Sequence, residues 1–205
     1  MINQKTHRHR TAAFSLIELL SVIAVTLTLL AVCVPGISGT IGGLKVTNAA
    51  QVVVEEIQTA RATALARNTP VEIWFLKEGN RYQAVRSSLI NINNTSSWLG
   101  RTRRLPEGVA FASAQKYSNV IGAQTAAAAP ESPAGTQGVR LRVYPSGRLE
   151  LVEASSSTPV GPNQPLFVTL TPYASFDVNS EGDLPKTFAT VQINPINSRI
   201  TTHRL

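Results

Sequence analysis

An apolar run of 21 residues near the N-terminus, from Phe14 to Val34, constrains the fold of this chain more than any other feature. As an α-helix the run is about 31 Å long, which matches the hydrocarbon core of a bilayer. Glu18 is the one charged side chain within it. A carboxylate at membrane depth is energetically costly, and such residues mark functional sites. The run therefore predicts a membrane-spanning helix in which Glu18 requires a positively charged partner.

The residues before this run are basic. Lys5, Arg8 and Arg10 lie in residues 1–13, which contain no acid. The positive-inside rule places this end in the cytoplasm and the residues after Val34 on the other side of the membrane. A secretory signal has only about 7–15 apolar residues, so this run is too long for one. An uncleaved membrane anchor is the alternative interpretation.

The octapeptide at the start of the run is similar to a known processing signal. Ala13-Phe14-Ser15-Leu16-Ile17-Glu18-Leu19-Leu20 resembles the class III signal of type IV pilins and type II secretion pseudopilins. This resemblance implies that prepilin peptidase cuts between Ala13 and Phe14 and methylates the new amine of Phe14. In the family a glycine usually precedes the cut, where this chain has Ala13. The resemblance also implies that Glu18 pairs with the Phe14 amine of a neighbouring subunit during filament assembly.

Proline and glycine are dense just after the apolar run. Pro35 and Gly36 are followed by three further glycines within residues 35–43. Proline lacks an amide hydrogen and glycine has low helix propensity, so we expect a hinge that interrupts the helix over residues 35–43. Pilins have a proline at a similar distance from the cut. A simple linker that leaves the membrane is the alternative.

A helical period returns after Leu44 and ends before a proline. Apolar residues from Val46 to Ala64 recur every three or four positions, and Asn68-Thr69-Pro70 ends the pattern. Period-two segments follow, with turn signals between them. We predict strands at 71–76, 81–86, 109–112, 139–144, 148–152, 166–171, 188–193 and 199–203. Residues 113–137 and 153–165 are expected to be mobile loops. A long helix followed by antiparallel strands predicts an α+β fold in which the helix covers a sheet.

Resemblances also extend over the C-terminal part of the chain. Segments 60–71 and 190–200 resemble the helix-to-strand junction and terminal hairpin of the minor pseudopilin H and FimT-like group. The whole chain is most similar to the prepilin-like group named Verru_Chthon cassette protein D. The segments shared with that group are Arg104–Gly108, Tyr144–Gly147 and Leu166–Leu170. The domain organisation implied is a leader at 1–13, a membrane or filament-core helix at 14–34, the hinge at 35–43 and a periplasmic domain at 44–205.

The composition argues against catalysis. The three histidines are His7, His9 and His203, so cleavage leaves one, and no acid is near it in the sequence. We therefore expect no enzyme activity, cofactor, metal site or small-molecule substrate. Asp177, Glu181 and Asp183 cluster in one loop, but their spacing matches no EF-hand, so a solvated acidic loop is favoured over a calcium site. The single cysteine, Cys33, excludes an intrachain disulfide.

The charge pattern leaves one alternative function open. The formal net charge is +7, and three of the positive charges belong to the leader. Arg101, Arg103 and Arg104 form the most basic patch, and such a patch binds nucleic-acid phosphates in some proteins. Scattered solvated arginines are the favoured interpretation, so nucleic acid is not expected as a partner. A DNA-binding minor pilin of an uptake system is the alternative.

The sequence and its resemblances together predict a structural subunit. It is expected to be a minor pilin-like protein that prepilin peptidase processes and that assembles with other pilin or pseudopilin subunits. The filament would belong to a type II secretion system or resemble a type IV pilus. The expected location is the bacterial inner membrane, with one membrane span, a cytoplasmic N-terminus and a periplasmic C-terminal domain, or the filament itself in the periplasm or outside the cell.

Overall fold

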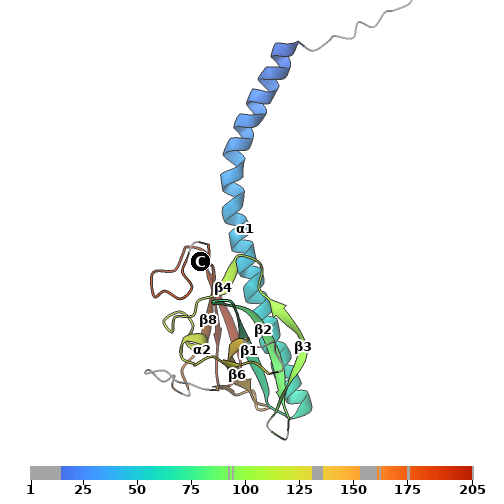
Figure 1. Cartoon of the computed structure of the whole chain (residues 1–205), viewed down its shortest axis with the longest axis vertical. Coiled ribbons are helices and arrows are strands. Elements are labelled where there is room, and N and C mark those ends of the chain that lie inside the picture. Colours follow the sequence, from blue (N-terminus) through green and yellow to red (C-terminus); the bar gives the residue numbers. More distant parts are fainter. Residues whose placement is uncertain are drawn as a thin grey trace, which may run out of the picture. The chain divides into compact units, whose positions relative to one another are not determined.

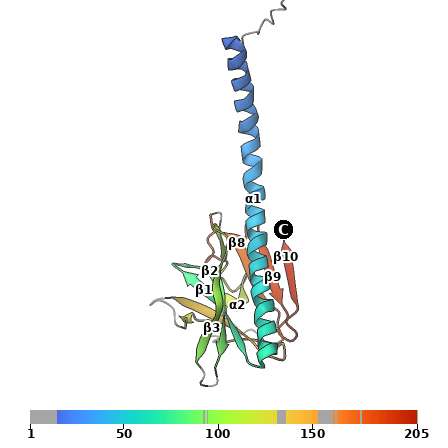
Figure 2. The same cartoon turned by 90° about the vertical axis from the view of Figure 1, so that its right-hand side faces the viewer.

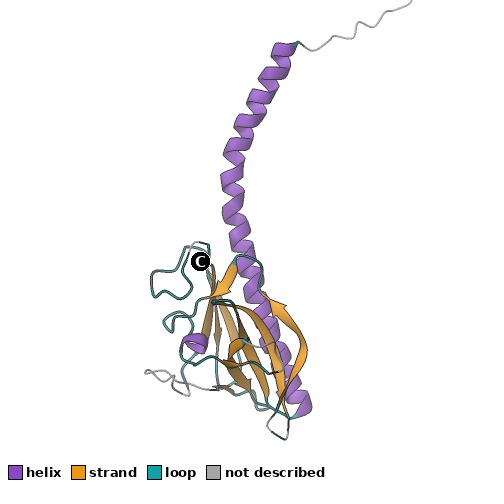
Figure 3. Cartoon of the chain, viewed as in Figure 1, coloured by secondary structure: helices purple, strands orange, loops and turns teal. Residues whose placement is uncertain are grey.

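The computed structural model describes residues 15–91, 93, 95–130, 136–152, 161, 163–174 and 176–204, with residues 32–40 described by their backbone alone. The chain divides into two compact units, residues 1–40 and residues 41–205, which are described separately. The first unit is helical where it is described, and the second combines helix and sheet (Figure 3). The α+β fold class predicted from the sequence is confirmed.

Helix α1 runs from Leu16 to Arg67. Its predicted end is confirmed, because Asn68 has a left-handed backbone, with φ of +49°, and Pro70 follows. The N–H of Thr69 donates to the carbonyl of Ala64 at 3.2 Å and closes the last turn.

The predicted interruption at residues 35–43 was wrong, since α1 is helical through this segment. Proline withdraws one backbone donor, and each glycine lowers helix stability by only about 1 kcal/mol, so helical structure persists across them. A hinge movement at Pro35 and Gly36 stays a prediction.

The second unit contains a ten-stranded sheet in which every pairing is antiparallel. Its order is β10-β9-β8-β4-β2-β1-β6-β5, with β3 paired to β2 and β7 paired to β6. The strands are β1 (Val71–Glu78), β2 (Arg81–Ile90), β3 (Ser96–Arg104), β4 (Val109–Phe111), β5 (Ala127–Ala128), β6 (Gln137–Val143), β7 (Leu149–Leu151), β8 (Leu166–Pro172), β9 (Ala189–Ile193) and β10 (Ile200–Arg204). A short helix, α2 (Asn119–Gly122), precedes β5.

The part of α1 within the second unit lies on the sheet, close to β2 and β3 (Figure 1) and beside β9 and β10 (Figure 2). Its buried stripe is rich in small residues, including Ala49, Ala60 and Ala64, each 0% exposed, and it also contains Ile57. Small side chains let the helix backbone approach the sheet closely. Below them, Phe75 and Phe111 meet edge-to-face with ring centroids 5.3 Å apart. This geometry is the favourable one for aromatic pairs.

All eight predicted strands are present, with small differences at their ends. Strand β3 was not predicted, because its sequence, SSWLGRTRR, is polar and does not alternate. It forms because β2 supplies backbone partners along most of its length. Residues 113–137 were expected to be a loop, but they contain α2 and β5. The sequence signal there was weak because α2 is only 4 residues long.

Candidate functional site

Two places in the structure carry chemistry that the fold alone does not require. The first is the start of α1, described from Ser15 to Ala31. Ten large apolar side chains in this segment are between 48% and 80% exposed, among them Leu16, Leu20 and Leu27. Exposed apolar surface of this extent is unfavourable in water and marks a contact with protein or lipid.

Glu18 closes a capping box at the N-terminus of α1. The N–H of Ser15 donates to Glu18 Oε2 at 3.1 Å, and the N–H of Glu18 donates to Ser15 Oγ at 3.2 Å. Two backbone donors that a helix N-terminus leaves without partners are thereby satisfied. The carboxylate also lies at the positive end of the helix dipole. The Ser-x-x-Glu spacing could have predicted this cap from the sequence.

Several predicted site residues fall outside what the structure describes. Ala13 and Phe14, the predicted cleavage and methylation positions, lie outside the described residues, as does the predicted leader, residues 1–13. In the described part of the chain, no helix has both the length and the mean hydropathy expected of a membrane span. The predicted span, 14–34, includes residues whose side chains are not described, and it stays a prediction.

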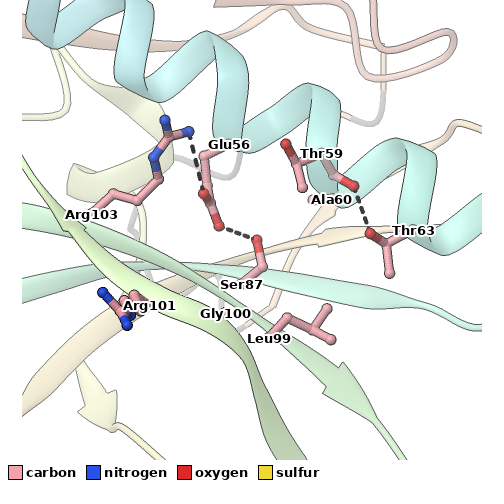
Figure 4. A pocket seen from close by; sticks show the side chains of 9 residues that line it. All are labelled: Glu56, Thr59, Ala60, Thr63, Ser87, Leu99, Gly100, Arg101 and Arg103. Carbon is pink, nitrogen blue, oxygen red and sulfur yellow. Dashed lines mark hydrogen bonds and ion pairs between the residues drawn. The ribbon is translucent and has the colours of Figure 1, made fainter.

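The second place is a pocket in the 41–205 unit, between α1 and strands β2 and β3. Its volume is about 330 Å³. The lining residues are Glu56, Thr59, Ala60, Thr63, Ser87, Leu99, Gly100, Arg101 and Arg103 (Figure 4). At its base, Ser87 Oγ donates a hydrogen bond of 2.5 Å to Glu56 Oε1. Glu56 is 7% exposed, so the pocket is built around a buried carboxylate.

The local sequence explains why β3 leaves room for this pocket. The pairing of β2 with β3 shifts register between Val85 and Ser87. Gly100, opposite this shift, has a φ of +63°, a left-handed conformation that favours glycine. Arg86 Nη2 donates to the Gly100 carbonyl at 2.9 Å and holds the irregular segment. A β-bulge of this kind bends a strand and redirects its side chains.

The predicted basic patch is partly neutralised. Arg103 points at α1, where Nη2 is 2.6 Å from Glu55 Oε2 and Nη1 is 3.9 Å from Glu56 Oε2. Arg104 pairs instead with Glu78, at 2.8 Å. Arg101 lines the pocket mouth and points away from Glu56 (Figure 4), and no ion pair joins it to another described residue. The structure therefore separates the three arginines, and nucleic-acid binding through them stays a prediction.

The ion pair affects the titration of Glu55. The hydrogen bond from Arg103, with a second one from Gln51, lowers the pKa of the Glu55 carboxyl below its ordinary value. The Gln51 bond spans one turn of α1, with Nε2 3.1 Å from Glu55 Oε1. Neither Glu56 nor its link to Ser87 was singled out from the sequence. No sequence signal could have found that link, because the two residues are 31 positions apart.

The acidic loop does not converge on one point. Asp177 Oδ1 accepts from the N–H of Asn179 at 3.1 Å, as in an ordinary Asx turn. Across the described residues, no three His, Cys, Asp or Glu side chains are grouped so that they could hold a metal ion. His203 Nε2 is 3.0 Å from Gln192 Oε1 on the neighbouring strand. The expectation that the chain is not an enzyme stays a prediction.

Comparisons with known proteins give limited information. No family model matches the chain, and no curated protein matches it either. Among solved structures, the minor pseudopilin EpsH from the Type 2 Secretion System of Vibrio cholerae is similar, with a TM-score of 0.43 and 11% identity. The alignment covers 78% of this chain and 96% of that one. A likeness this weak does not establish a shared fold.

Proposed function

We propose that this chain is a minor pilin-like structural subunit, or pseudopilin, of a type II secretion or type IV pilus-like filament. The observation that carries the proposal is the start of α1, where a predominantly apolar exposed surface has a single carboxylate, Glu18, in the first turn. A helix that is apolar on all sides is stable only when lipid or other helices surround it. Both surroundings exist for a subunit that passes from the inner membrane into a filament.

Processing completes the proposed site. Prepilin peptidase cuts between Ala13 and Phe14 and methylates the Phe14 amine, as the sequence resemblance implies. The positive amine of one subunit then pairs with Glu18 of a neighbour. In the single chain this carboxylate is hydrogen-bonded to the backbone of Ser15, so it is already oriented at the N-terminus of the helix. Removing a charge pair from water requires such additional hydrogen bonds to be favourable.

The remaining unit acts as the exported domain. Residues 41–205 contain their own buried core, and the apolar stripe of α1 within this unit is covered by the sheet. The first unit therefore supplies the assembly surface, while the second presents loops and strands to partners outside the membrane. The proposal places the chain in the bacterial inner membrane, with a cytoplasmic N-terminus and a periplasmic domain, before assembly.

The first experiment is an intact-mass and N-terminal peptide analysis of the protein from membranes of cells with and without prepilin peptidase. A peptidase-dependent start at N-methylated Phe14 supports the proposal. An intact leader in both samples contradicts it and favours an uncleaved membrane anchor.

Three variants distinguish two roles of Glu18, its negative charge and its hydrogen bonds in the helix cap. Glu18→Gln keeps a side chain that can form the capping box but removes the charge, whereas Ser15→Ala removes the serine half of the box and keeps the charge. Glu18→Ala removes both. Cleavage should be largely unaffected in all three, because the scissile bond is outside the helical turn they change.

Co-purification with partner subunits is the measurement. The proposal expects Glu18→Gln and Glu18→Ala to lose co-assembly, and Ser15→Ala to retain it. If Glu18→Gln assembles normally while Ser15→Ala and Glu18→Ala fail, Glu18 serves as a helix cap only, and the proposed pairing is wrong.

A further inference from the structure

The last strand, β10, is a free edge of the sheet. It pairs with β9 on one side and stands at the end of the strand order, so none of the described strands covers its other side. Figure 2 shows β10 as the outermost strand, beside α1 and β9. An uncovered edge strand presents backbone donors and acceptors that can pair with another extended chain.

The pairing register of β10 with β9 shows which backbone groups of β10 point away from the sheet. The N–H of Asn194 donates to the carbonyl of Arg199 at 2.9 Å. In an antiparallel pair, every second residue directs both its N–H and its C=O at the partner strand. Residues 201 and 203 therefore face β9 with their backbones, and Ile200, Thr202 and Arg204 direct theirs away from the sheet. Thr202 is the central outward residue.

A groove lies at the start of this edge strand. It has a volume of about 160 Å³ and lies between α1 and the start of β10. Its floor includes the apolar side chains of Ile57 and Ile200, and Ile200 also packs against the main core. Along a strand, alternate side chains share one face, so an added strand would place every second side chain toward this groove.

The charged side chains that line the groove and end β10 are positive. Arg61 and Arg199 line the groove, and Arg204 ends the strand. Residues 184–204 contain no acid, and no ion pair joins any of these three arginines to an acid among the described residues. A second copy that paired antiparallel about Thr202 would place Arg204 opposite Ile200 and next to Arg199 of the other strand, and like charges on neighbouring strands are unfavourable. An acidic segment would instead form opposite-charge pairs.

We propose that β10 is a docking edge that binds an extended acidic segment of a partner protein as an additional strand. Backbone hydrogen bonds to Ile200, Thr202 and Arg204 supply the pairing, and the arginines select against basic or neutral segments. This mode of recognition, strand addition at a sheet edge, takes affinity from the main chain and specificity from alternate side chains. The inference concerns the exported unit and does not depend on processing at Phe14.

The test uses the full-length protein in a neutral detergent and a labelled peptide of seven residues in which glutamate and valine alternate. A peptide with lysine in place of glutamate is the matched probe. Fluorescence anisotropy should show at least roughly tenfold tighter binding of the glutamate peptide, decreasing as salt screens the charges.

Two pairs of variants test the edge itself. Thr202→Pro removes the outward N–H without removing a bond to β9, and it should weaken binding at least about tenfold. Thr202→Val keeps the N–H and should bind as the unchanged chain does. Arg199→Glu combined with Arg204→Glu should also weaken binding about tenfold, whereas the charge-matched pair Lys45→Glu and Lys77→Glu should have little effect.

Each alternative outcome overturns the proposal. Absence of binding, or binding that neither Thr202→Pro nor the Arg199→Glu, Arg204→Glu pair reduces, excludes β10 as the docking edge. Equal binding of the peptide and of a single-stranded oligonucleotide, unaffected by Thr202→Pro, indicates a general anion site. If Thr202→Pro fails to fold, as judged by circular dichroism, the arginine pair and amide exchange of Thr202 with and without peptide decide the question.

Discussion

Two parts of α1 differ in how far their apolar side chains are exposed. Residues 15–31 carry large leucines, isoleucines and valines that are about half exposed or more, whereas residues 46–64 carry a stripe of alanines and valines, with Ile57, that is at most 2% exposed. The first part has large apolar side chains on every side, with Glu18 and a few serines and threonines between them. The second has polar residues beside the stripe, as expected for a helix on a sheet.

The comparison shows how side-chain volume indicates the partner of a helix. Alanine at positions 49, 60 and 64 adds little apolar area, but it lets the sheet approach until larger residues such as Phe75 fill the space. Leucine on all faces cannot be covered by one sheet. A helix of that kind requires an apolar medium or several neighbouring helices, which the chain itself does not supply in the described residues.

The carboxylates of these two parts of α1, Glu18 and Glu56, also differ in their exposure. Glu18 is exposed, and its partners are the backbone and side chain of Ser15, within one helical turn. Glu56 is buried, and its partners, Ser87 and Arg103, come from two strands of the sheet. The first carboxylate is available to another molecule. The second is committed to the fold, with the pocket opening beside it.

The largest expected effect comes from removing volume beneath the second part of α1. Ile57→Ala should lower the free energy of unfolding of the 41–205 unit by about 2–5 kcal/mol, because it leaves a cavity in a fully buried site. Leu27→Ala, the matched change in the first part, should leave it unchanged. Chemical denaturation followed by the fluorescence of buried Trp74 measures both. Equal effects would contradict the division of the helix into two roles.

A second test adds volume instead. Ala60 faces the sheet and is 0% exposed, whereas Ala62, two positions later, is exposed. Ala60→Leu should destabilise the 41–205 unit by about 1–3 kcal/mol through overpacking, and Ala62→Leu should change its stability by less than about 0.5 kcal/mol. The same denaturation assay applies. A tolerated Ala60→Leu would show that the close approach of α1 to the sheet is not required.

A substitution at the base of the pocket should cause a smaller loss of stability. Ser87→Ala removes the donor to the buried carboxylate of Glu56, and the expected loss of stability is about 1–2 kcal/mol. Ser96→Ala, in the less buried strand β3, is the control and should have almost no effect. Comparable losses in the two variants would mean that the Glu56 contact does not stabilise this unit.

The smallest effect concerns pH. Because hydrogen bonds from Arg103 and Gln51 lower the pKa of Glu55, the folded state favours the charged carboxylate. That stabilisation is present above the ordinary glutamate pKa and is lost as the pH falls through the lowered value. Carboxyl chemical shifts in an acid titration should show the Glu55 midpoint rising toward its ordinary value in Arg103→Gln. An unchanged midpoint would contradict the assigned ion pair.

Local signals predicted a large part of the second unit. The helix end before Pro70 and the hairpin turn at residues 77–80 depend on residues close in sequence, and both were predicted correctly. The interruption at Pro35 and Gly36 was predicted from the same local chemistry and was wrong, because helical hydrogen bonds on both sides outweigh a few unfavourable residues. Strand β3 was missed because its stability comes from pairing with β2 and not from its own pattern.

Features that depend on residues a few positions apart can be predicted from the sequence: the apolar run with Glu18, the apolar stripe of α1 and the turns between strands. The order of the strands, the free edge at β10 and the contacts of Glu56 with Ser87 and Arg103 are seen only in the folded chain. These contacts join residues that are 31 and 47 positions apart in the chain (87 − 56 = 31 and 103 − 56 = 47), or they follow from strand pairing. Local propensity does not specify which distant strands pair, whereas burial of one continuous core does.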